Sequence, residues 1–114
     1  MTNTQTGRRA ETVAAAYLRQ HGYQILQENW RTRYCEIDIV AHKQATVHFV
    51  EVKYRASANY GHGLEYITAQ KVRQMTFAAR MWTQQYSWRG MTVLSALEVG
   101  GSDFAVTEFI EALV

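Results

Sequence analysis

The sequence predicts a single α/β domain in which a mixed sheet of about five strands is flanked by helices, in the order α-β-β-β-α-β-β. Two observations lead to this prediction. Apolar residues recur at steps of three and four in two segments of the chain, and they alternate or run together in the shorter segments around these. The 114 residues, 47% of them hydrophobic and none of them proline, suit one domain spanning 1–114 without an internal linker.

Two segments have the apolar periodicity of amphipathic helices. The first is Arg8–His21, which Gly22 would end because glycine readily adopts the left-handed conformation after a helix. The polar residues before it, Met1–Gly7, are expected to be flexible. The second segment is Thr68–Tyr86, with Thr68 as its N-cap. Its buried stripe is predicted to consist of Val72, Met75, Ala79, Trp82 and Tyr86.

The shorter segments are predicted to be strands, namely Tyr23–Trp30, Cys35–Ala41, Val47–Lys53, Met91–Val99 and Phe104–Ile110. The polar turn His42–Thr46 joins the second and third of them into a hairpin. Both faces of Val47–Lys53 are apolar, which places this strand in the middle of the sheet. Tyr54–Gly63 is a predicted loop, in which Gly61 and Gly63 favour backbone mobility.

The composition narrows the class of protein. A net charge of +2 is mildly basic and does not by itself identify a partner. The single cysteine, Cys35, cannot form an internal disulfide. The sequence has neither the apolar segment of a signal peptide nor a run of about 18 apolar residues that could span a membrane. We therefore expect a soluble cytoplasmic protein with no membrane partner.

The residues most informative about function lie in the predicted hairpin. Its first strand carries Glu36 and Asp38, and its second strand carries Glu51 and Lys53. Acidic residues are depleted in strands, and a buried carboxylate needs a partner or a metal ion. Because the short turn pairs the two strands, Asp38 and Glu51 can converge near one edge, with Lys53 on the same face as Glu51.

This set of side chains fits metal-assisted hydrolysis of a phosphodiester. Mg²⁺ prefers oxygen ligands and keeps several waters, so two or three carboxylates suffice to hold it. The ion lowers the pKa of a bound water, and a nearby lysine orients that water or stabilises charge on the phosphate. Glu11, on the helical face of Ala14 and Leu18, is a further candidate ligand. The alternative is a solvated strand face, on which Glu51 and Lys53 form a surface ion pair worth about 0–1 kcal/mol.

Basic residues surround these carboxylates in the sequence. They suit a phosphate ligand, and we predict that DNA contacts Arg8, Arg31, Arg33 and Arg55. The alternative for any one of these arginines is ordinary solubilising charge. The four histidines show no metal-ligand spacing, and a single cysteine cannot build a structural zinc site.

A series of motifs between Gly7 and about Ala79 carries a family resemblance. In chain order the motifs are Gly7-x-x-Ala10-Glu11, Ala15-x-Tyr17-Leu18, Gly22-Tyr23-x-Ile25-Leu26, Asn29-x-Arg31, Glu36-Ile37-Asp38-Ile39-Val40-Ala41, Phe49-Val50-Glu51-Val52-Lys53-x-Arg55, Gly61 and Lys71. They resemble the YraN family, a bacterial family of largely uncharacterised small proteins that is similar to archaeal Holliday-junction resolvases.

The resemblance implies a restriction-endonuclease-like fold of the PD-(D/E)XK type. Carried over by position, it implies a catalytic set formed by Asp38, Glu51, Lys53 and Glu11, whose three carboxylates would bind Mg²⁺ or Mn²⁺. The accessory residues implied in the same way are Glu36, Arg55 and Lys71. The resemblance also implies DNA as the partner and a homodimer as the assembly, because the related resolvases are dimers. Aromatic residues that can be exposed, namely Tyr34, Tyr54, Tyr60 and Trp88, favour the same assembly.

Three positions depart from the family pattern. Ala10 and Cys35 stand where the family usually has glycine, and Leu94-Ser95-Ala96 replaces an Arg-Phe-Asp element. With its core residues intact, the sequence predicts a metal-dependent nuclease-like domain acting on branched or single-stranded DNA. The alternative is a nucleic-acid-binding or protein-interaction module that keeps the fold without catalysis, which the small size and near-neutral charge favour.

Overall fold

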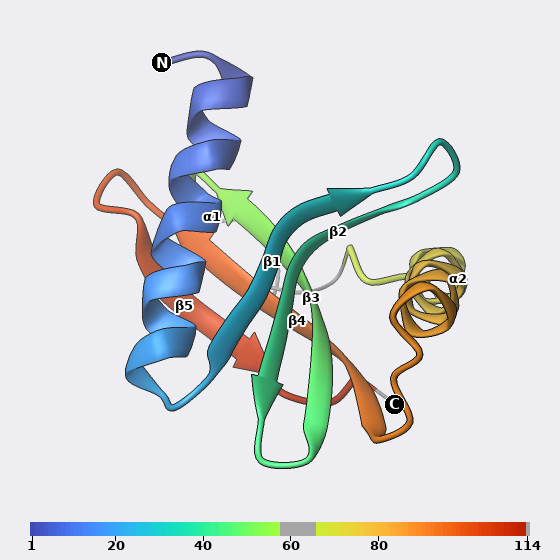
Figure 1. Ribbon diagram of the computed structural model, residues 1–114. Helices are drawn as coiled ribbons and strands as arrows, with labels where there is room; N and C mark the ends of the chain where they lie inside the picture. The colour runs from blue at the N-terminus through green and yellow to red at the C-terminus, as the bar shows by residue number, and fades with distance from the viewer. Residues whose placement is uncertain (58–65, 114) are drawn as a thin grey trace.

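A computed structural model describes residues 1–57 and 66–113 of the chain (Figure 1). Its elements are α1 (Asn3–Gln20), β1 (Gln24–Arg31), β2 (Glu36–Lys43), β3 (Thr46–Arg55), α2 (Ala69–Tyr86), β4 (Met91–Gly100) and β5 (Ala105–Ile110). The strands form one sheet in the order β1-β2-β3-β4-β5. β3 and β4 are parallel, and the other neighbours are antiparallel. The predicted α/β class, the mixed five-stranded sheet and the order of elements are confirmed.

α1 begins at Asn3, earlier than the predicted start at Arg8, because its N-terminus is capped. The Thr2 hydroxyl accepts the backbone N–H of Gln5 at 3.1 Å, and the Gln5 side chain accepts the backbone N–H of Thr2 at 2.8 Å. This capping box satisfies donors that the first turn of a helix leaves unpaired. At the other end, Gly22 has a φ of 87°, as expected for a residue that follows a helix.

α1 lies across one face of the sheet (Figure 1). Many of its contacts there are made by small side chains. Ala10, Ala14 and Ala15 are buried there together with Leu18. Their partners in this core are Tyr23, Ile39, Ala41, Val50, Leu97, Val99 and Phe104. The small alanine side chains of Ala10, Ala14 and Ala15 let this part of the helix lie close to the sheet, which also brings Glu11 near the strands.

α2 covers the opposite face, mainly against β2 and β4. Thr68 is its N-cap, as predicted, and accepts the backbone N–H of Lys71 at 3.1 Å. Two residues of the predicted buried stripe differ, since Val72 is half-buried and Tyr86 is 45% exposed. Tyr86 is the last residue of α2, where its ring lies against Trp82 and its hydroxyl accepts a hydrogen bond from Gln27. The residues that α2 does bury are Met75, Ala78, Ala79 and Trp82. In the described ranges, neither helix is long and apolar enough to cross a membrane.

β3 is the central strand, as its two apolar faces predicted. It pairs with β2 on one side and with β4 on the other. It also continues to Arg55, so Tyr54, which was predicted to start a loop, belongs to the strand. The remainder of that predicted loop from Ala58 onward, including Gly61 and Gly63, lies outside the described residues.

Candidate functional site

β2 and β3 part at the position of the predicted site residues. Their antiparallel pairing runs from the hairpin turn to Ile39 opposite Val50 and ends there. Asp38 is the next residue of β2 beyond the last pair. One of its carboxylate oxygens accepts a hydrogen bond from the backbone N–H of Val52 at 2.8 Å. In a regular strand pair, a backbone carbonyl oxygen of the neighbouring strand would accept this bond. The Asp38 carboxylate is therefore fixed against the backbone between Glu51 and Lys53.

The Asp38 carboxyl is largely removed from water and lies among other acids. Burial raises its pKa most, and the charge of Glu51 raises it further. The hydrogen bond from Val52 acts in the opposite direction, while Glu11 and Glu36 add smaller increases. The result is a pKa raised from 3.8 to about 7. Carboxylates that oppose one another's ionisation in this way form a site that favours a positive charge.

Asp38 lines a cavity of about 500 Å³ beside the first turns of α1, which we call the α1 hollow. Its acidic lining consists of Asp38, Glu11 and Glu36, and its basic lining consists of Arg8 and Arg31. Arg31 also lies 3.7 Å from a carboxylate oxygen of Glu36 in an exposed ion pair. The structure thus brings Glu11 beside Asp38, together with two of the arginines predicted to contact DNA.

Glu51 lines a second cavity, of about 580 Å³, between the β1–β2 turn and α2, which we call the α2 groove. A carboxylate oxygen of Glu51 lies 3.0 Å from Nζ of Lys71, which α2 carries. Lys53 instead places its Nζ 5.4 Å from the centre of the Tyr66 ring. The ion pair of Glu51 is therefore with Lys71, and not with Lys53 as the surface-pair alternative expected. Glu36 lines both the α1 hollow and the α2 groove.

The donor chemistry of these residues fits a hard divalent cation. Mg²⁺ takes oxygen ligands and is commonly held by one or two carboxylates, with waters and substrate phosphates completing its shell. Within residues 1–57 and 66–113, no three acidic, histidine or cysteine side chains lie close enough together to hold an ion as they stand. Asp38 with Glu51 or Glu11 is a suitable donor pair, and their role as metal ligands stays a prediction.

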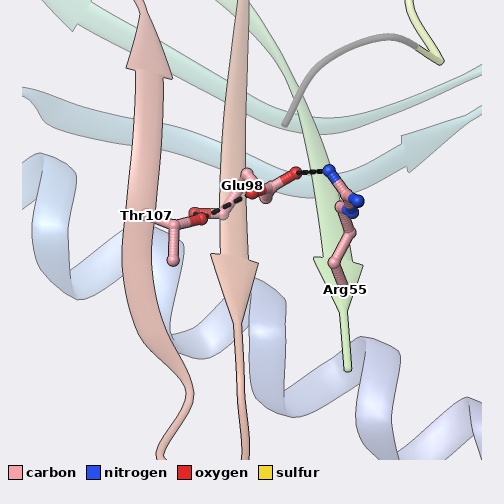
Figure 2. Close-up of polar contacts among 3 residues, drawn as sticks. All are labelled: Arg55, Glu98 and Thr107. Atoms are coloured by element: carbon pink, nitrogen blue, oxygen red, sulfur yellow. Dashed lines mark hydrogen bonds and ion pairs between the residues drawn. The ribbon is translucent and has the colours of Figure 1, made fainter. Parts of the chain in front are cut away.

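Glu98 of β4 is a buried acid that the sequence analysis missed. Its backbone lies opposite that of Lys53 in the parallel β3–β4 ladder, and the residue is only 6% exposed. One carboxylate oxygen accepts the Thr107 hydroxyl at 2.7 Å, and the other lies 3.6 Å from Nη1 of Arg55 (Figure 2). Arg55 is therefore held along the sheet by Glu98. An acid inside the apolar strand Met91–Val99 was the signal that could have identified it.

Tyr66, just before α2, is a second residue that the sequence analysis missed. Its hydroxyl is buried and has no hydrogen-bond partner among the described residues. Burial raises its pKa most, followed by the charges of Glu51, Glu98 and Asp38. The phenol therefore stays protonated at neutral pH and is a neutral donor among carboxylates. Its position follows from tertiary packing, and no local sequence pattern indicated it.

The departures from the family pattern are accommodated by the fold. Ala10 is a buried helical residue, and Cys35 does not have a positive φ, so neither position needs the conformational freedom of glycine. Ser95, in the element that replaces Arg-Phe-Asp, is fully buried. Its hydroxyl lies 3.1 Å from Nδ1 of His48, so a neutral polar pair stands where the family has charge.

Comparison with known proteins identifies the family. A family model described as uncharacterised protein family UPF0102 matches residues 10–99. A UPF0102 protein of Chlorobium phaeobacteroides is 49% identical over 76 residues, which cover 67% of this chain and 60% of the relative. A UPF0102 protein of Leifsonia xyli is 45% identical over 82 residues, which cover 72% of this chain and 70% of the relative. A UPF0102 protein of Vibrio parahaemolyticus is 37% identical over 81 residues, which cover 71% of this chain and 67% of the relative.

The matched segment contains all four residues of the predicted catalytic set, from Glu11 to Lys53. The chain spans less than two thirds of the Chlorobium relative and about two thirds of the other two. The family model covers most of the chain, and the motifs that carried the resemblance lie largely inside it. The chain therefore belongs to the uncharacterised protein family UPF0102, the YraN family that its motifs resemble.

Proposed function

We propose that this protein is a metal-dependent, endonuclease-like enzyme that hydrolyses phosphodiester bonds in branched or single-stranded DNA. The observation that carries the proposal is the position of Asp38 at the point where β2 and β3 part. Its carboxylate accepts the N–H of Val52 at 2.8 Å and is thereby held beside Glu51 and Lys53. Two carboxylates and a lysine at one end of a strand pair are the groups that metal-assisted phosphodiester hydrolysis requires.

Each residue of the predicted set has a distinct role in this proposal. Mg²⁺ or Mn²⁺, when bound, supplies a Lewis acid and a water of lowered pKa. Asp38 and Glu51 provide its oxygen ligands, and Glu11 adds one from α1. Lys53 is exposed, so its ammonium group can reach a phosphate and stabilise the charge that develops there. The arginines of the α1 hollow contact phosphates on either side of the bond that is cut.

A second function is favoured by a different observation. Lys71 already places a positive charge 3.0 Å from Glu51, and the described part of the chain contains no ready group of three metal ligands. A non-catalytic module for binding nucleic acid or protein would keep this arrangement permanently, with the lysine in place of a cation. Binding to DNA would then be independent of divalent metal.

The experiment that separates the two functions uses a panel of DNA substrates. The purified protein is incubated with Mg²⁺ or Mn²⁺ and with linear duplex, single-stranded, flap and four-way-junction DNA. We expect cleavage of at least one branched or single-stranded substrate by the wild type. We expect Glu51→Gln to lose this cleavage while circular dichroism shows that it is folded. Lys53→Ala should cleave more slowly and should still bind the metal in a calorimetric titration.

Glu28→Gln is the matched control for Glu51→Gln. Glu28 is an exposed acid on β1 that lies 3.8 Å from Arg19, outside both cavities. Its loss changes the net charge by the same amount without touching the proposed site. If no substrate is cut with either metal, and DNA binding is the same with and without metal, the non-catalytic module is the better description.

A further inference from the structure

The α2 groove extends from Glu51 along the outer side of α2. Residues at helical spacing on α2 form one wall, and they include Gln70, Arg73, Gln74 and Phe77. Tyr34, in the turn between β1 and β2, contributes to the other wall. Figure 1 shows this turn projecting past the sheet on the side where α2 lies. At about 580 Å³, the groove has the size of a site for a small molecule or a single nucleotide.

Two aromatic rings in this groove are exposed. Phe77 is 48% exposed and Tyr34 is 68% exposed. Phe77 is not among the residues through which α2 packs on the sheet. The guanidinium of Arg33 lies 5.3 Å from the centre of the Tyr34 ring. Aromatic rings combined with arginine are the groups on which proteins stack unpaired nucleobases. The groove therefore offers flat apolar surfaces to a planar ligand.

The polar residues of the groove suit the other parts of a nucleotide. Lys71 and Arg73 supply positive charge for a phosphate, and the amide of Gln74 can both donate to and accept from the edge of a base. Glu51 belongs to the same cavity, so an occupant extends directly to the proposed cleavage site. A base in duplex DNA is stacked on both faces and cannot offer one to a side chain, whereas an unpaired base can.

We propose that the α2 groove binds an unpaired nucleotide of a DNA strand, with its base against Phe77 and Tyr34 and its phosphate beside Lys71 and Arg73. This inference rests on the proposed function, because Glu51 joins the groove to the cleavage site. It assigns the substrate preference to the groove, since only DNA with an unpaired nucleotide near the cut fills it.

The test measures binding in EDTA, where no metal-dependent cleavage takes place. Fluorescence anisotropy gives the affinity for a duplex, for the same duplex with a short single-stranded gap, and for the single strand. We expect the wild type to bind the gapped and single-stranded DNA more tightly than the duplex. Phe77→Ala should weaken binding to both by about tenfold and leave duplex binding unchanged. Phe77→Trp should restore the preference, because it restores a stacking surface.

A 2-aminopurine placed at the unpaired position reports stacking directly, because its fluorescence falls when it stacks on an aromatic ring. Quenching by the wild type and by Phe77→Trp, but not by Phe77→Ala, is the expected result. Met91→Ala, which removes another exposed apolar side chain away from the groove, is the control and should behave as the wild type does.

Equal affinity of the wild type for duplex and gapped DNA, or equal quenching by Phe77→Ala, would overturn the inference and would point to a different occupant, such as a peptide. Because these measurements need no metal, their failure is separate from failure of the proposed nuclease activity. Quenching without cleavage of any substrate would leave the nucleotide site in place and remove the catalytic function.

Discussion

Asp38 is the residue on which the electrostatics of the site depend most. Burial and the charge of Glu51 raise its pKa from 3.8 to about 7, so its carboxyl is partly protonated near neutral pH. In the unfolded chain the same group ionises near its ordinary pKa. Between about pH 4 and pH 7 the folded state therefore binds more protons than the unfolded state, and the free energy of unfolding falls as the pH rises.

This shift predicts the behaviour of Asp38→Asn without metal. Asparagine has no charge to remove from water, and its side-chain carbonyl can still accept the N–H of Val52. We expect the variant to be more stable than the wild type by roughly 1–3 kcal/mol at pH 8, and by little at pH 3, where the aspartic acid is mostly neutral in both states. Urea unfolding in EDTA at both pH values measures the difference. Parallel pH profiles for the two proteins would contradict the prediction.

Some site residues were predictable and others were not. Asp38, Glu51 and Lys53 could be placed together because a short hairpin turn and a two-residue period fix which side chains of neighbouring strands meet. The partner of Glu51 was expected on the same strand and instead comes from α2, as Lys71. Tyr66 could not be placed either, because both contacts depend on how helix and sheet pack.

At the scale of elements, the Arg55, Glu98 and Thr107 contacts join β3, β4 and β5 beside the site (Figure 2). Glu98→Ala removes a buried ion pair and a charge-assisted hydrogen bond together. We expect it to lower the free energy of unfolding by roughly 2–4 kcal/mol. Thr107→Val removes the hydrogen bond alone and should lower it by about 1–2 kcal/mol. Chemical denaturation measures both, and a Glu98→Ala variant as stable as the wild type would refute the role given to these contacts.

The elements themselves followed closely from the sequence where periodicity decides them. The strand boundaries lie within two residues of the predicted segments, and Thr68 caps α2 as expected. The start of α1 was missed because apolar periodicity begins only at Ala10, whereas the helix begins at its cap. The Thr2-x-x-Gln5 pattern of a capping box was the signal for the earlier start. This first turn matters because it lines the α1 hollow.

At the scale of the whole molecule, one small domain presents limited surface to a branched DNA. We propose that two copies act together as a homodimer, as the resemblance to dimeric resolvases implies. Of the aromatic residues that favoured a dimer in the sequence, Tyr34 is exposed, Tyr54 stacks on Phe104 and Trp88 is half-buried. The fourth, Tyr60, lies outside the described residues. Light scattering at high concentration should give about twice the 13.1 kDa mass of one chain. A mass near 13.1 kDa would contradict this expectation.

The central claim is that the carboxylate held between β2 and β3 takes part in metal-dependent cleavage of DNA. Its most direct test is the single-turnover cleavage rate of Asp38→Asn beside the wild type, with Mg²⁺ and a substrate that the wild type cuts, both proteins being purified in parallel with Glu28→Gln as the control. We predict that Asp38→Asn is folded and at least about a hundredfold slower, while Glu28→Gln cleaves at the wild-type rate. Cleavage by Asp38→Asn at the wild-type rate would contradict the account.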